Sequence, residues 1–281
     1  MSELMPILRG LLRSRTSSLI VLLQVALTMA VVVNALDIVQ SRLGKMNRET
    51  GMDTENMLVL QSRGFRTDYE HRATVERDLA WLRALPGVVA ATPTNSLPLS
   101  GSGNSSSFAV EPPGGERERA SFSVNYYRMD ETALDALGTR LRSGRAFRAD
   151  EVPWLRANAF EPATVALVTA AFAERVFGTV DAVGRTLYYD TGDPLRIVGV
   201  LDHMQGAWVS WEYLDHVMIQ PGIDPGPRIR YLVRTAPGLR DAVIARIEAE
   251  LPGRDLTRMI RDVKSFEAVI RRSYSRDRTM T

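Results

Sequence analysis

An uninterrupted apolar stretch near the N-terminus is the clearest pattern of hydrophobic and polar positions in the chain. Residues 19–36 contain no charged side chain, and the few polar side chains among them are uncharged. A helix over these positions would rise about 27 Å, which matches the hydrocarbon core of a bilayer. A secretory signal has a shorter apolar region and ends at a cleavage site of small residues, and no such site follows here. The pattern therefore predicts a transmembrane helix over residues 18–39, in preference to a cleaved signal or a buried helix of a soluble domain.

The flanks of this stretch predict its orientation. Several arginines precede the span, and no acid lies between Glu3 and Asp37. Because positive charge favours the cytoplasmic side, the N-terminus is expected in the cytoplasm and everything after the span outside it. Residues 1–17 place their leucines on one helical stripe, which indicates either an amphipathic segment on the inner membrane face or a cytoplasmic extension of the span.

The expected span also has a patterned surface. Gln24 and Thr28 are four residues apart and share a face, whereas Ala26 and Ala30 form a pair of small residues on roughly the opposite face. Polar side chains and small residues at this spacing both favour contact between helices in lipid. We therefore expect these four residues to pack against neighbouring membrane helices.

After the span, the pattern changes to alternating strands and helices. Residues 40–55 are expected to continue as a helical stalk that ends at Gly51. Residues 56–98 show the pattern of a strand, a helix stopped by the sequence LPG, and a second strand, which is a βαβ unit. The same order of elements, with a second LPG stop, returns in residues 227–263.

The two βαβ units are expected to pack as one layered domain. Apolar residues at helical spacing mark the buried face of each helix, with Leu79 and Leu82 in the first helix and Ile247 and Leu251 in the second. These four residues are the predicted core of the domain.

The segment between the two units, residues 99–226, has a different pattern. Its short strands and helices predict a small mixed α/β subdomain inserted into the first domain, and residues 100–107 are expected as a flexible loop. Residues 264–281 carry apolar side chains at helical spacing and predict a second stalk, after which we expect the natural protein to continue with a second span. The expected fold class is α+β, with one N-terminal transmembrane helix, helical stalks and a domain outside the cytoplasm.

Composition narrows the classes of function. The net charge of the 281 residues is +2, and acids and bases are mixed along the chain, so nucleic-acid binding has no support. The chain contains no cysteine, which leaves the redox compartment undetermined.

The sequence offers little chemistry. His203 and His216 lie beside aspartates, but no HExxH motif or cysteine pair accompanies them, so a metal site is not expected. The chain lacks a P-loop and a nucleophile elbow, so neither an ATP site nor a serine nucleophile is expected. Trp208 and Trp211 suit either an exposed contact patch or, as we favour, the core of the subdomain. We therefore expect no enzyme activity and no cofactor in this chain.

The order of these pieces resembles the periplasmic core domain of MacB-like ABC transporter permeases, which belong to the FtsX-like type. The stretches that carry the resemblance are RALPGVVAATPTNSLPL, LGTRLRSGRAF, VALVTAAFAERVFGTVDAVGRTL and LRIVGVLDHMQGAW. The resemblance extends over nearly the whole chain and depends on the order of the stretches more than on any single motif. It implies that the two βαβ units form a Porter-like domain and that the inserted subdomain is Sabre-like.

The resemblance also implies a function. Such permeases dimerise and work with ATP-binding subunits that power motion across the membrane. Many act with a periplasmic adaptor and an outer-membrane channel to export peptides, antibiotics or other small cargo. Because no nucleotide-binding domain is fused here, the resemblance implies a separate ABC ATPase subunit, a bacterial inner-membrane location and a periplasmic main domain. The alternative is a membrane-tethered extracytoplasmic sensor or binding module, and an exported enzyme is disfavoured by the missing chemistry.

Overall fold

The computed structural model describes residues 15–46, 48–114, 120–156, 160–224 and 226–277 and divides the chain into two units. The first unit, Met1–Glu49, contains helix α2 (Arg15–Met46). Its segment Leu19–Ile38 has a mean hydropathy of 2.5, is 0% buried, and is long and apolar enough to cross a membrane. Of the amphipathic segment predicted for residues 1–17, residues 1–14 lie outside the described part of the chain.

The first helix ends earlier than the sequence pattern predicts. The helical stalk was expected to reach Gly51, whereas α2 ends at Met46. Gly51 has a φ of +72°, and a Cβ atom there would lie 2.1 Å from the His203 carbonyl oxygen, so the close approach to this loop requires glycine. The Asp53 amide donates to the Leu137 carbonyl oxygen at 3.0 Å. The Asp53 amide therefore bonds to the domain, whereas in a continued helix it would bond to a carbonyl oxygen of that helix.

The second unit, Thr50–Thr281, contains two sheets, and the first sheet joins both βαβ units. Its strand order is β11-β1-β10-β2, and every neighbouring pair is antiparallel. The strands are β1 (Met57–Gly64), β2 (Val88–Thr94), β10 (Arg228–Thr235) and β11 (Arg258–Ser265). Because β10 lies between β1 and β2, the two βαβ units interleave in one sheet.

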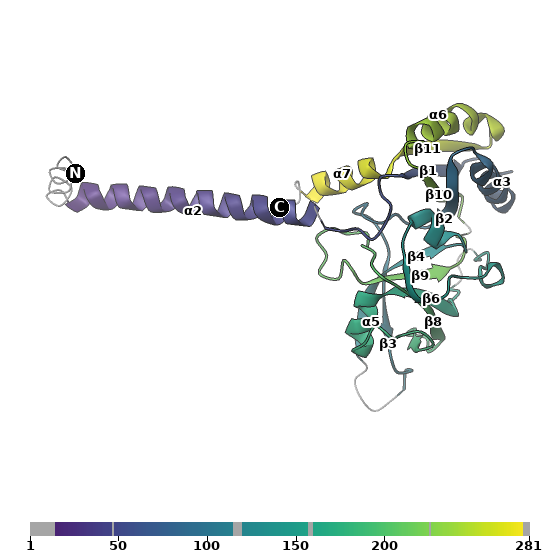
Figure 1. Cartoon of the computed structure of the whole chain (residues 1–281), viewed down its shortest axis with the longest axis horizontal. Helices are drawn as coiled ribbons and strands as arrows, with labels where there is room; N and C mark the ends of the chain where they lie inside the picture. The colour runs from purple at the N-terminus through teal and green to yellow at the C-terminus, as the bar shows by residue number, and fades with distance from the viewer. Residues whose placement is uncertain (1–14, 47, 115–119, 157–159, 225, 278–281) are drawn as a thin grey trace. The chain divides into compact units, whose positions relative to one another are not determined.

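Two helices cover one face of this four-stranded sheet (Figure 1). They are α3 (His71–Ala84) and α6 (Arg240–Glu250). The residues singled out in the sequence, Leu79, Leu82, Ile247 and Leu251, are all buried in one cluster with side chains of the sheet. Burying a side chain of this size contributes about 1.5–3 kcal/mol, so this layer is a large source of stability.

The second sheet is mixed and lies in the inserted segment. Its strand order is β5-β8-β6-β9-β4-β3-β7, with β4–β9 and β6–β8 parallel and the other pairs antiparallel. The strands are β3 (Ser105–Ala109), β4 (Ser121–Met129), β5 (Leu141–Gly144), β6 (Val165–Thr169), β7 (Thr186–Tyr188), β8 (Pro194–Leu201) and β9 (Val217–Pro221). Helix α5 (Ala170–Phe177) packs against it through Phe172, and α4 (Ala133–Leu137) lies against β2.

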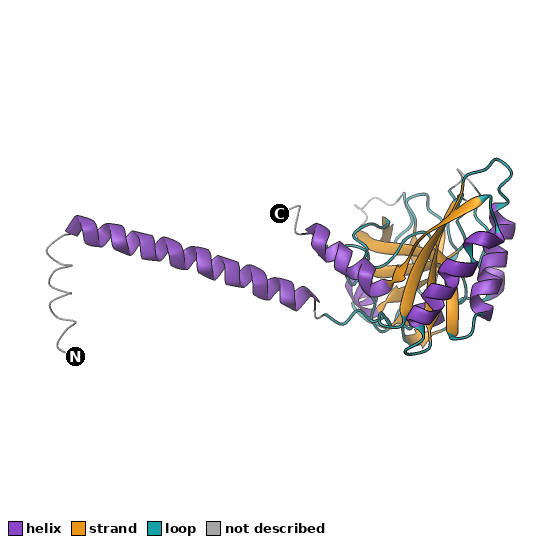
Figure 2. Cartoon of the chain, turned by 90° about the horizontal axis from the view of Figure 1, so that it is seen from above, coloured by secondary structure: helices purple, strands orange, loops and turns teal. Residues whose placement is uncertain are grey.

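The two sheets share a hydrophobic cluster. Met57 and Leu232 of the four-stranded sheet pack in it with Tyr127 and Ile219 of the mixed sheet, and all four side chains are buried. Figure 2 shows the strands of this unit flanked by its helices. The predicted α+β fold class, with two βαβ units and an inserted mixed subdomain, is confirmed; the interleaving of the two units is an addition from the structure. The boundaries drawn at residues 98/99 and 226/227 stay a prediction.

Arginines hold Glu151 in the short helix η1 (Ala149–Glu151). Arg145 donates to both carboxylate oxygens of Glu151 at 2.7 Å, and the Arg148 amide donates at 2.9 Å. The hydrogen bonds from Arg145 are the largest cause of a pKa of Glu151 that is lowered to about 2.

This arrangement predicts a loss of stability in acid. Because the pKa of Glu151 is lower in the folded chain than the ordinary value of 4.5, its carboxylate stabilises the fold above that value, and the contribution is lost as the pH falls towards about 2. Glu151→Gln should lower the free energy of unfolding by about 1 kcal/mol at pH 7 and by progressively less below pH about 4.5. Urea unfolding of both proteins across this range measures the difference, and a difference independent of pH would contradict the assignment.

Candidate functional site at the base of the C-terminal helix

The C-terminal helix α7 (Phe266–Asp277) continues strand β11 without an intervening loop. Phe266 is fully buried, and Val269 is nearly so, in the cluster that the two sheets share. Ile270 and Tyr274 pack on a second cluster formed by three buried apolar residues, Leu99, Val209 and Leu214. Helix α7 therefore packs on the domain from Phe266 as far as Tyr274.

A close contact fixes α7 on its other side. A Cβ atom on Gly101 would lie 3.1 Å from the Ser273 hydroxyl oxygen, so the loop passes directly over the helix. The Gly101 amide donates to the Ala207 carbonyl oxygen at 2.9 Å. The prediction of a flexible loop over residues 100–107 is wrong for its second half, because strand β3 begins at Ser105 and pairs with β4. The serine-rich composition hid this strand, since serine favours turns.

Ion pairs tie α7 to the neighbouring helix α6. Arg240 of α6 lies 3.5 Å from the Glu267 carboxylate of α7, and the same arginine donates to the Glu55 carbonyl oxygen. Arg271 lies 3.9 Å from Glu267 on the solvent side of α7. The Arg240 pair crosses between the two helices and the Arg271 pair lies within α7; both are partly exposed, so each contributes little stability.

A buried ion pair connects β11, the strand that α7 continues, to α3. Arg258 donates to both carboxylate oxygens of Asp78, at 2.6 Å to Oδ1, and both side chains are almost completely buried. The Tyr231 hydroxyl donates to Asp78 at 2.8 Å, and Arg258 also donates to the Ser62 hydroxyl oxygen at 3.0 Å. Burial raises the pKa of Asp78, and the charge of Arg258 opposes that shift. The pair thereby joins three strands and α3 at the end of β11 away from α7.

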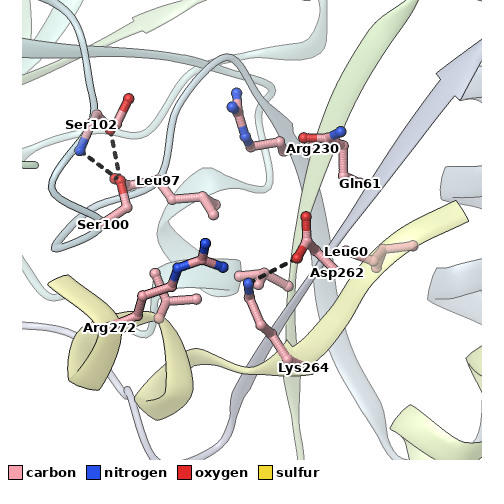
Figure 3. Close-up of a pocket in the computed structure, with 11 residues that line it drawn as sticks. Leu60, Gln61, Leu97, Ser100, Ser102, Arg230, Asp262, Lys264 and Arg272 are labelled. Carbon is pink, nitrogen blue, oxygen red and sulfur yellow. Dashed lines mark hydrogen bonds and ion pairs between the residues drawn. The ribbon is translucent and has the colours of Figure 1, made fainter. Parts of the chain in front are cut away.

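A polar hollow of about 270 Å³ opens between α7 and the four-stranded sheet (Figure 3). Val59 of β1 and Val269 of α7 form part of its apolar wall, and the loop that carries Leu97 closes one side. Asp262 has a φ of +55°, and residues 262–263 of β11 lie opposite Leu60 alone, which makes a β-bulge. Asp262 and Lys264 are two residues apart in β11, and both line the hollow.

The other residues singled out in the sequence do not form a chemical site. Among the described residues, no group of three or more histidine, aspartate or glutamate side chains is arranged to hold a metal. His216 stacks on Tyr213 with ring centroids 5.2 Å apart, and burial lowers its pKa. Trp208 and Trp211 contact each other edge to face, with ring centroids 5.5 Å apart. Both are half-buried, which lies between the exposed patch and the buried core expected from the sequence.

The packing residues expected in the span are exposed in the described chain. The Thr28 hydroxyl donates to the Gln24 carbonyl oxygen at 2.8 Å, so this hydrogen bond stays within α2. Ala26 and Ala30 are exposed as well. Contact of this surface with further membrane helices remains a prediction.

Comparison with known families decides the assignment. The sequence model described as MacB-like periplasmic core domain matches residues 18–250, which is most of the chain. The chain belongs to this family. The MacB-like domain is the periplasmic domain of a family of ABC-type membrane permeases.

Solved structures are similar to the MacB-like chain at low identity. The periplasmic region of MacB from Actinobacillus actinomycetemcomitans is 17% identical, with 82% of this chain and 94% of that chain covered and a TM-score of 0.40. The extracellular domain of the noncanonic ABC-type transporter YknZ from Gram-positive bacteria is 15% identical, with 72% and 99% covered and a TM-score of 0.40. No curated protein matches the chain.

Sequence reasoning missed two features of the MacB-like domain. Asp78 lies on the apolar stripe of α3, three residues after Val75 and four before Leu82, so an acid on a buried face was a signal for a buried partner. The hollow had no comparable signal, because its lining comes from separate strands, one loop and α7.

Proposed function

We propose that this chain is the transmembrane and periplasmic part of an ABC transporter permease subunit, which transmits ATP-driven motion to the periplasm for export. The observation that carries this proposal is the root of α7. The helix continues β11 directly, and its first turn is buried between the two sheets at Phe266. A displacement of α7 would therefore move the four-stranded sheet with it, because packed cores transmit displacement as rigid bodies.

The proposal includes partners that the chain requires. In this proposal a separate ABC ATP-binding subunit supplies the energy. The permease would work as a homodimer or with a paired permease, and would act with a periplasmic adaptor and an outer-membrane channel on peptides, antibiotics or other small cargo. The location would be the bacterial inner membrane.

The orientation of the proposed subunit is testable with reporter fusions. Because arginines precede the span and no acid lies between Glu3 and Asp37, we expect the N-terminus in the cytoplasm and the domain in the periplasm. An alkaline phosphatase fused after residue 64 should be active, and a fluorescent protein that folds only in the cytoplasm should be dark at the same position. The opposite pair of results would reject the orientation.

Motion of the two helices tests the proposed function itself. The chain has no cysteine, so Gly44→Cys on α2 and Arg271→Cys on α7 place two spin labels without other changes. In the full-length permease with its ATPase subunit, we expect the distance between the labels to differ between nucleotide-free and ATP-bound states. An identical distance distribution in both states would favour a membrane-tethered sensor or binding module instead.

A further inference from the structure

The hollow between α7 and the four-stranded sheet collects positive charge from three separate elements. Arg230 of β10, Lys264 of β11 and Arg272 of α7 line it, and Figure 3 draws the three side chains. Asp262 is the one carboxylate in the described lining, so the hollow carries a net charge of +2. Clustered cations repel one another, so an anion bound there would stabilise the fold.

Little of this charge is neutralised within the described part of the chain. Lys264 pairs with Asp262 at 3.1 Å, and both are partly exposed. Arg230 donates to the Asn95 carbonyl oxygen at 2.6 Å, and this acceptor carries no full charge. Burial, and next the charge of Arg228, lower the pKa of Arg230. Arg272 forms no ion pair with a described residue and is exposed at the mouth. Two guanidinium groups are therefore available to an incoming anion.

Neutral donors complete the lining. Ser100 donates to carbonyl oxygens of its own loop, at 2.8 Å to Leu97 and 2.7 Å to Ser102, so its proton is already used. Ser102 and Gln61 also line the hollow, and their side chains form no hydrogen bond with a described residue. The cations and polar side chains of the lining come from separate strands, a loop and α7, which suits a tetrahedral group better than a flat one.

We propose that this hollow is a binding site for a phosphate group with a dianionic charge, carried either by a soluble phosphate or by a lipid headgroup. A phosphate monoester carries about −1.5 to −2 charges at neutral pH and accepts hydrogen bonds at three oxygens. It matches both the net charge and the number of donors, whereas a carboxylate would leave a positive charge unpaired. Arginine pairs with phosphate through two parallel hydrogen bonds, which Arg230 and Arg272 can provide. The bound group would connect α7 to β10 and β11.

Calorimetric titration of the 281-residue chain in maltoside micelles at low ionic strength tests this site. The two probes are inorganic phosphate and dihexanoyl phosphatidic acid below its micelle concentration. We expect saturable binding of at least one probe, and the probe that binds more tightly identifies the source. Arg272→Gln should weaken that binding about tenfold, because a charge-assisted hydrogen bond is lost. Lys264→Gln should weaken it as well.

Two further variants make the test specific to the hollow. Asp262→Asn should tighten binding a few-fold, since it removes the competing carboxylate, and asparagine tolerates the positive φ at this position. Arg271 directly precedes Arg272 in α7 and is not in the lining. Arg271→Gln should therefore alter the affinity less than about twofold. The proposal is overturned if neither probe saturates below about 10 mM. It is also overturned if Arg271→Gln and Arg272→Gln weaken binding equally, which would indicate diffuse attraction to a basic helix.

Discussion

Asp78→Ala is expected to lower the free energy of unfolding of the domain by about 3–5 kcal/mol. The variant leaves the Arg258 guanidinium buried without a counter-charge, and it removes the acceptor of the Tyr231 hydroxyl. The cost comes from this uncompensated charge more than from the attraction that is lost. Urea unfolding followed by tryptophan fluorescence measures it, because all four tryptophans lie in the unit Thr50–Thr281.

A second variant and a control separate this cause from a general sensitivity of the fold. Asp78→Leu combined with Arg258→Met replaces both charges by apolar groups and should recover most of the loss. Asp68→Ala breaks a solvent-exposed pair with Arg66 and should leave the unfolding midpoint nearly unchanged. Equal losses for Asp78→Ala and Asp68→Ala would contradict the role assigned to the buried pair.

Ile247→Asp is expected to destabilise the domain by more than about 4 kcal/mol, as is Leu79→Asp. Both side chains are buried in the layer between the helices and the four-stranded sheet, and no cation described in that apolar cluster would pair with the new carboxylate. Because the layer joins both βαβ units, a loss at either helix should unfold the whole unit in one transition. The same unfolding assay reports the midpoint.

Leu256→Asp is the matched control for these two variants. Leu256 is 78% exposed, so a carboxylate there remains in water and should change the stability by less than about 0.5 kcal/mol. If Ile247→Asp and Leu256→Asp unfold at the same urea concentration, the helix layer does not stabilise the domain as described.

Local patterns were enough to predict the elements of the fold. Helices α3 and α6 each end just before an LPG sequence, because proline disfavours continuation of a helix, and Gly87 after α3 adopts a φ of +90°. The apolar run of α2 and the helical spacing of Leu79 and Ile247 are properties of adjacent residues. Such signals do not depend on the rest of the chain, so they were visible in the sequence.

Features that depend on distant residues were not predictable in the same way. Strand β10 lies between β1 and β2. Local sequence pattern does not determine the order of strands in a sheet, so this position was not predictable. The end of α2 at Met46 depends on backbone contacts of Asp53 and on the approach of Gly51 to His203. The lining of the hollow beside α7 comes from residues far apart in the sequence, so local pattern does not show it.

The central claim of this account is that α7 and the four-stranded sheet move as one body. Arg271→Cys on α7 and Val89→Cys on β2 are both exposed positions for spin labels. The distance between them is measured in the full-length permease with its ATPase subunit, with labelled chains diluted in unlabelled ones. The account predicts one narrow distance distribution that is the same with and without ATP. A broad distribution, or one that shifts with nucleotide, would show that α7 bends away from the sheet, and it would contradict the account.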